Sequence, residues 1–136
     1  MEHSKPTKIS HIGIAVIDLE KAVADFGRVF DTTEVELIEI GGEGVKVAMI
    51  KLGDSEIELL SPVSDRGAIA KFLRERGEGI HHLALTVDDV SRAIDAAKKK
   101  GLIILDEVPR KGARGAEAAF VHPKSMHGVL LEFYNR

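Results

Sequence analysis

The sequence predicts an α+β fold made of two tandem modules, each with the order strand, helix, strand, strand, strand. The first observation is that His11-Ile-Gly-Ile-Ala-Val is echoed 71 positions later by His82-Leu-Ala-Leu-Thr-Val. The second is that a helix-spaced apolar stripe follows each of these runs. The third is an acidic residue inside an apolar run late in each copy, Glu58 and Glu132. Self-similarity at a near-constant offset indicates a duplicated unit.

Each module begins with a strand whose residues alternate between two faces. In the first copy one face carries Ile12, Ile14 and Val16, and the other carries His11, Gly13 and Ala15. The second copy matches it, with Leu83, Leu85 and Val87 opposite His82, Ala84 and Thr86. If each helix packs on the large apolar face, both histidines point to the opposite face among small residues, where there is room for a ligand.

The helices are predicted from their caps and apolar stripes. Asp18 and Asp89 are the expected N-caps, and Gly101 is the expected C-cap of the second helix. The stripes are Leu19, Val23, Phe26 and Phe30 in the first helix and Val90, Ile94 and Ala97 in the second.

Further strands are predicted at 35–40, 45–51 and 56–60 in the first copy and at 103–107, 117–121 and 129–133 in the second. Gly-rich turns separate them, notably at 41–44 and 112–115. Residues 61–79 join the copies, and 68–76 are predicted to form a short helix with Ile69, Phe72 and Leu73 turned inward.

Length and composition fit one compact domain over residues 8–136, after a flexible N-terminus at 1–7. Within it, module one covers about 8–62, the connecting segment 63–79 and module two about 80–135. The net charge of −3 argues against nucleic acid as the main partner, and the apolar runs are too short to cross a bilayer. The absence of cysteine excludes disulfides and thiolate metal ligands and is compatible with a cytoplasmic location.

The repeat supplies two histidines and two carboxylates, His11, Glu58, His82 and Glu132. A carboxylate buried without a partner costs several kcal/mol, so the two acids in apolar strands are expected to have a cation nearby. Two imidazoles and two carboxylates suit a divalent ion such as Co²⁺, Mn²⁺, Ni²⁺ or Zn²⁺. The alternative is that both acids lie on exposed strand edges.

Four segments carry a resemblance to a known family. They are His11-Ile-Gly-Ile-Ala-Val, Ile57-Glu-Leu-Leu-Ser-Pro62, Gly77-Glu-Gly-Ile-His-His82-Leu-Ala and Phe120-Val-His-Pro-Lys-Ser-Met-His-Gly-Val-Leu-Leu-Glu132. With the paired modules, they resemble the vicinal oxygen chelate superfamily, which includes glyoxalases, extradiol dioxygenases and antibiotic-resistance proteins. Within it they are most similar to the methylmalonyl-CoA epimerase family.

This resemblance implies a curved mixed sheet around a central metal site, with the helices on the outer face. It implies the same four metal ligands, a preference for Co²⁺ and an isomerase that inverts the α-carbon of methylmalonyl-CoA through a metal-stabilised enolate. It also implies a place in propionate metabolism. A homodimer is expected partly from the resemblance and partly because a small sheet exposes its edges.

Inversion needs a proton-transfer group on each side of the enolate. Glu132 is the candidate for one. Some family members carry a Glu in the third strand, where this chain has Val47, so the second group stays open among Glu43, Lys51 and a water molecule on the metal.

The nearest cationic residues for the coenzyme A portion are Arg110, Lys111 and Lys124, with Arg114 beside them; a solvated basic loop is the equal alternative. Two other functions share the same fold. One is a glyoxalase-like lyase or another metal-dependent enzyme, and the other is a non-enzymatic binding protein, which would not need the His and Glu set.

Overall fold

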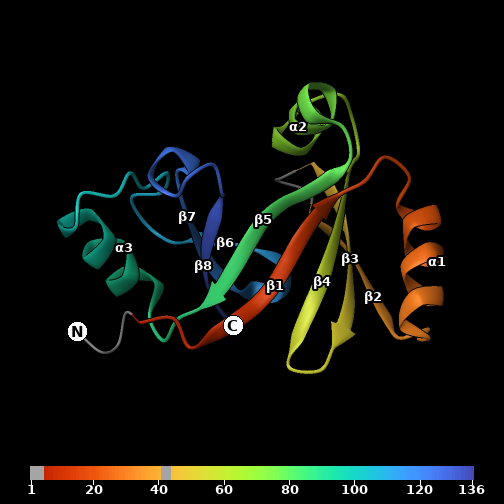
Figure 1. Ribbon diagram of the computed structural model, residues 1–136, viewed down its shortest axis with the longest axis horizontal. Coiled ribbons are helices and arrows are strands. Elements are labelled where there is room, and N and C mark those ends of the chain that lie inside the picture. Colours follow the sequence, from red (N-terminus) through yellow and green to blue (C-terminus); the bar gives the residue numbers. More distant parts are fainter. Residues whose placement is uncertain (1–4, 41–43) are drawn as a thin grey trace. The chain divides into compact units, whose positions relative to one another are not determined.

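The structure is a computed structural model that describes residues 5–40 and 44–136 (Figure 1). Its described residues form eight strands and three α-helices, which confirms the predicted α+β class. The chain divides into two compact units. The Ile12–His81 unit is continuous, and the His82–Arg136 unit also includes the chain up to His11. The prediction of one domain over 8–136 stays a prediction.

The Ile12–His81 unit has the strand order β2-β3-β4-β1, and β3 pairs antiparallel with both β2 and β4. Its elements are β1 (Lys8–Ala15, from Ile12 on), α1 (Leu19–Phe30), β2 (Val35–Ile40), β3 (Val45–Leu52), β4 (Ser55–Pro62) and α2 (Ala68–Arg76). All four strands and both helices were predicted to within two residues.

Helix α1 begins where it was expected, because the Asp18 carboxylate accepts a hydrogen bond from the Lys21 backbone N–H at 3.1 Å. The helix lies beside the strands of its unit (Figure 1). Its predicted stripe packs in one apolar cluster with the large face of β1 and with β3 and β4. The members include Ile12, Ile14, Val16, Leu19, Val23, Phe26, Phe30, Ile50 and Leu59. Helix α1 therefore covers the face that the alternation predicted.

A second cluster in the same unit contains Ala15, which shares the parity of His11 in β1. Here α2 contributes Ile69, Phe72 and Leu73, the three residues predicted to turn inward. They pack with Val45, Val47, Met49 and Leu60. Both faces of these strands are thus filled with apolar side chains.

The His82–Arg136 unit has the strand order β1-β5-β8-β7-β6. Its elements are β5 (Gly79–Thr86, from His82 on), α3 (Val90–Lys99), β6 (Arg110–Lys111), η3 (Ala113–Gly115), β7 (Glu117–Val121), η4 (Pro123–Ser125) and β8 (Leu131–Asn135), together with β1 up to His11. Strand β8 pairs parallel with β5 and antiparallel with β7, so the sheet is mixed, as predicted.

Helix α3 repeats the capping of α1, because Asp89 accepts a hydrogen bond from the Arg92 N–H at 3.1 Å. Gly101 follows the helix with a φ of 84°, in the left-handed region that favours glycine. The predicted stripe packs against β7 and β8 in a cluster of Val87, Val90, Ala93, Ile94, Ala97, Ala119, Val121 and Phe133.

Two strand predictions in the second copy need correction. Residues 103–107 form only a single bridge, between Ile104 and Val121. The Asp106 side chain accepts the Phe120 N–H at 2.7 Å, so a carboxylate takes the place of a ladder carbonyl there. Strand β8 starts at Leu131 and not at 129, because the Val129 N–H bonds back to the Met126 carbonyl in the preceding turn.

Two other predictions fall partly outside the described residues. They are the flexible N-terminus, of which residues 1–4 are not described, and the Gly-rich turn at 41–44, of which 41–43 are not described. In the parts of the chain that are described, no helix is both long and apolar enough to span a membrane.

Candidate metal centre

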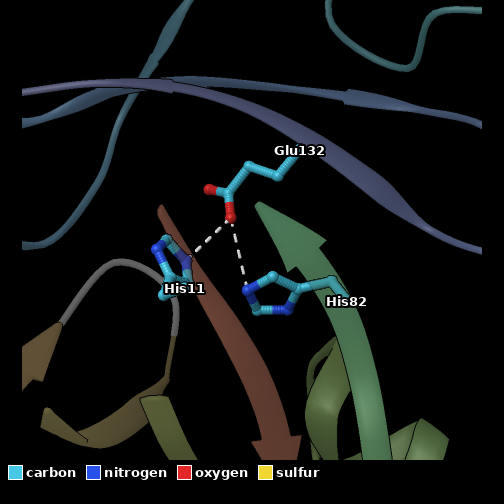
Figure 2. Close-up of side chains that lie close together, drawn as sticks. All are labelled: His11, His82 and Glu132. Carbon is cyan, nitrogen blue, oxygen red and sulfur yellow. Dashed lines mark hydrogen bonds and ion pairs between the residues drawn. The ribbon is translucent and has the colours of Figure 1, made fainter. Parts of the chain in front are cut away.

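Three of the four predicted ligands converge in the His82–Arg136 unit (Figure 2). His11 comes from β1, His82 from β5 and Glu132 from β8. One ligand atom of each lies within 4.8 Å of the others, and the three residues are only 1%, 4% and 7% exposed. Three buried metal-binding groups from three separate strands therefore point at one place.

Strand pairing explains this convergence. Glu132 lies opposite Ala84 in the parallel pairing of β5 with β8. His82 stands two residues before Ala84, so it projects to the same face of the sheet. Strand β1 is the neighbour of β5 on its other side, which brings His11 beside His82. The parity predicted from the repeat is therefore the parity that the unit has.

One carboxylate oxygen joins both histidines. Glu132 Oε1 lies 3.1 Å from Nε2 of His11 and 3.2 Å from Nε2 of His82. Burial by itself raises the pKa of Glu132, but the hydrogen bonds and electrostatic attraction of the two imidazoles outweigh it and lower the pKa to about 2. The carboxylate is therefore held in its charged form, which is the form that binds a metal.

Aromatic rings and alanines surround these groups. The Tyr134 ring stands edge-to-face against His11 at 4.9 Å, and the Phe120 ring against His82 at 5.8 Å. The two imidazoles are themselves edge-to-face at 5.4 Å. Tyr134 also packs with a small-residue cluster of Ala84, Ala116 and Ala118. Aromatic rings thus pack against both imidazoles, and the small residue Ala84 lies opposite Glu132 in the strand pairing.

Arg110 is anchored close to this site. Asp106 Oδ1 accepts hydrogen bonds from its Nε at 2.9 Å and its Nη2 at 2.6 Å. The guanidinium carbon then lies 5.2 Å from the centre of the Phe120 ring, a cation–π contact. Phe120 is paired with Glu132 across β7 and β8. The Phe120 ring therefore links the Arg110 guanidinium to the metal-binding groups.

The other two predicted substrate contacts are more exposed. The Lys111 Nζ lies 3.6 Å from Glu117 Oε2 at the surface. Lys124 is exposed in η4, where its backbone N–H donates to His122 Nδ1 at 2.9 Å. Their contact with a substrate stays a prediction.

Glu58, the fourth predicted ligand, is buried on β4 opposite Met49, in the Ile12–His81 unit. Its role as a ligand stays a prediction. Val47 is completely buried in an apolar cluster and offers no proton-transfer group. Of the candidates for the second group, Lys51 is exposed on β3 and Glu43 lies outside the described residues.

Sequence reasoning missed four neighbours of the site: Ser10, Asp106, Phe120 and Tyr134. The parity of β8 could have revealed Tyr134, which stands two residues after Glu132. Finding Phe120 requires knowledge of the register between β7 and β8. Finding Asp106 requires the knowledge that its side chain replaces a backbone carbonyl in a strand pairing. No sequence pattern signals either feature. Ser10 was not considered because alternation places it on the face opposite His11.

The donor set fits a divalent metal ion, because two buried imidazoles and a carboxylate are the ligands that such ions share in proteins without thiolates. A family model described as the Glyoxalase/Bleomycin resistance protein/Dioxygenase superfamily matches residues 10–120. The chain therefore belongs to this superfamily.

Within this superfamily, the chain is similar to methylmalonyl-CoA epimerases. The mitochondrial methylmalonyl-CoA epimerase of Homo sapiens is 36% identical over 126 residues, which are 92% of this chain and 72% of that protein. The ethylmalonyl-CoA/methylmalonyl-CoA epimerase of Cereibacter sphaeroides is 35% identical, over 92% of this chain and 95% of that protein.

A solved structure of a methylmalonyl-CoA epimerase in complex with methylmalonyl-CoA and NH₄⁺ matches with a TM-score of 0.89. It is 35% identical, and the match covers 96% of this chain and 94% of that one. The chain thus falls within the methylmalonyl-CoA epimerase family, as its motifs predicted, and it is an enzyme of the isomerase class.

Proposed function

We propose that the chain catalyses the metal-dependent epimerisation of (R)- and (S)-methylmalonyl-CoA. The observation that carries the proposal is the convergence of His11, His82 and Glu132 at one buried point in a member of this family. The bound substrate in the related structure supports the choice of methylmalonyl-CoA.

His11, His82 and Glu132 would hold the metal, with Glu58 as the fourth ligand that the internal repeat suggests. Co²⁺ is favoured by the family resemblance, and Mn²⁺, Ni²⁺ and Zn²⁺ also suit nitrogen and oxygen donors. When bound, such an ion would stabilise the negative charge that develops on the thioester oxygen as the α-proton leaves.

Glu132 is the side chain that we assign to proton transfer. Its Oε1 faces the two imidazoles, so we assign Oε2 to the proton of the α-carbon. Inversion also needs a donor on the opposite side of the enolate. Glu43, Lys51 and a water molecule on the metal are the candidates, and the buried Val47 has no proton to give.

Arg110 is the substrate contact that its surroundings favour most. Coenzyme A thioesters of malonate derivatives carry a free carboxylate and phosphates, and a guanidinium binds both groups through paired hydrogen bonds. Asp106 fixes the Arg110 side chain over Phe120, so little side-chain entropy is lost when an anion binds. Lys111 and Lys124 would attract the anionic substrate more weakly, because their side chains are exposed.

A homodimer, a cytoplasmic location and a place in propionate metabolism belong to the same proposal. Sedimentation at micromolar concentration tests the first of these, since a monomer mass there would refute the dimer.

The activity is tested by incubating the protein, each first-row divalent ion in turn and methylmalonyl-CoA in deuterated water. We expect deuterium to appear at the α-carbon, because every turnover removes that proton. Methylglyoxal with glutathione, offered to the same samples, tests the glyoxalase alternative. Deuterium incorporation at the background rate with every ion would refute the epimerase.

A further inference from the structure

His11 has a close contact at each end of its ring. Its Nε2 faces Glu132 at 3.1 Å, on the side of the proposed metal. Its Nδ1 lies 3.0 Å from the hydroxyl oxygen of Ser10, the residue directly before it in β1. Ser10 is only 8% exposed and His11 only 1%, so this hydrogen bond is shielded from water. Buried hydrogen bonds of this kind hold an imidazole in one orientation.

The direction of the Ser10 hydrogen bond depends on where the imidazole hydrogen is. A neutral imidazole carries one N–H and one lone pair. When Nε2 carries the hydrogen and donates to Glu132, Nδ1 has the lone pair, and the Ser10 hydroxyl must donate to it. When Nε2 gives its lone pair to a metal, the hydrogen resides on Nδ1, and the Ser10 oxygen must accept.

A serine hydroxyl can do both, because it carries one donor and two acceptor lone pairs. An aspartate at this position could only accept, and an alanine could do neither. We propose that Ser10 is a positioning residue of the metal centre, whose hydroxyl reverses its hydrogen bond as His11 passes from the metal-free to the metal-bound tautomer. The proposal rests on the proposed metal site and adds a residue to it.

Loss of such an outer partner of a ligating histidine lowers metal affinity by roughly 10- to 100-fold. We therefore expect Ser10→Ala to raise the dissociation constant of Zn²⁺ by about that factor, measured by competition with a chelator. Ser10→Thr keeps the hydroxyl and should restore most of the affinity. Ser10→Asp should favour the Nδ1–H tautomer even without metal.

Ser61→Ala is the matched control. Ser61 is also a buried serine, 6% exposed, and its hydroxyl donates to the Ile17 carbonyl at 3.1 Å in the other unit. Its loss removes a comparable hydrogen bond and should lower stability to a similar extent. It should leave Zn²⁺ affinity unchanged, which separates positioning of the ligand from general stability.

The tautomer itself can be read from the ¹⁵N chemical shifts of the His11 ring by long-range ¹H–¹⁵N NMR. In the wild-type chain we expect the hydrogen on Nε2 without metal and on Nδ1 with Zn²⁺. The same tautomer in both states, or an unchanged Zn²⁺ affinity in Ser10→Ala, would overturn the role of Ser10 and leave the epimerase proposal standing. If the wild-type chain binds no divalent ion, the metal centre itself fails, and Ser10 with it.

Discussion

The two faces of the sheet in the His82–Arg136 unit differ sharply, although they share the same strands. In β8, Phe133 packs toward α3, whereas its neighbours Glu132 and Tyr134 belong to the face that carries the histidines. The α3 face is filled with large apolar side chains such as Ile94 and Val121. The opposite face carries His11, His82 and Glu132 together with alanines, and it is called the polar face below. Strand alternation thus separates the apolar residues that stabilise the unit from those that we propose to bind the metal.

The Ile12–His81 unit lacks this separation. Both of its described faces are covered by apolar clusters, one with α1 and the other with α2, and Glu58 lies opposite Met49 of the α2 cluster. Its buried polar residues among those described are Glu58 and Ser61, against Ser10, His11, His82 and Glu132 in the other unit. The two copies thus share a fold, and most of the described buried polar residues lie in the His82–Arg136 unit, to which the first copy contributes Ser10 and His11.

The largest effect should come from Glu132→Gln, which removes the charge from the polar face while keeping its shape. We expect α-proton exchange to fall by about 10²- to 10⁴-fold, the usual worth of a positioned base. Asp25→Asn is the control, since Asp25 is an exposed carboxylate paired with Lys21 and Arg28 on α1. Exchange that survives Glu132→Gln would mean that another group takes the proton.

Ile94→Ala tests the opposite face. Ile94 is 2% exposed, and deleting a buried Ile side chain costs roughly 2–5 kcal/mol. Urea unfolding should show this loss, whereas metal content per folded chain should not change. Val29→Ala, at a site 78% exposed, should shift stability by less than about 0.5 kcal/mol. A metal content that falls together with stability would show that the two faces are not independent.

Acid should weaken the polar face before the apolar one. The pKa of Glu132 is lowered from 4.5 to about 2 in the folded chain, so its contribution is complete above pH 4.5 and is lost as the pH falls through about 2. At about 1.4 kcal/mol per pKa unit, this lowering of the Glu132 pKa corresponds to at most about 3–4 kcal/mol of stability. Urea unfolding with a chelator at about pH 3 and pH 6 should show a smaller change in Glu132→Gln than in the wild type. Equal pH dependence in the two would contradict it.

The smallest effects concern the features that both units share. Asp18→Ala and Asp89→Ala each remove an N-cap bond of 3.1 Å and should each cost about 1 kcal/mol. Thermal unfolding of the two variants measures both. A large effect at only one cap would show that the duplicated helices no longer play equal structural parts.

Much of this arrangement could be predicted because it depends on local patterns. Residues close together in the sequence determine the alternation in β1 and β5, the Asp caps and the helical stripes. The structure confirms each of these features. The convergence of His11 with His82 followed from parity together with the repeat. Glu132 joined them because it occupies the same place in its copy as Glu58.

The remainder depends on side chains that override local patterns. Residues 103–107 look like a strand, but Asp106 bonds Phe120 and Arg110 and leaves only a bridge. The 129–131 segment is apolar, yet its first N–H bonds back into a turn. The contact between Ser10 and His11 joins residues that alternation places on opposite faces. Predicting each of these contacts requires a distance between atoms, which the periodicity of a sequence does not give.

The central claim is that the polar face of the His82–Arg136 unit binds a divalent ion, and metal stoichiometry tests it most directly. The metal-free protein, titrated with Co²⁺ in a calorimeter, should bind one ion per chain, and His82→Ala should bind none while keeping its circular dichroism spectrum. Wild-type stoichiometry and affinity in a folded His82→Ala variant would contradict the account.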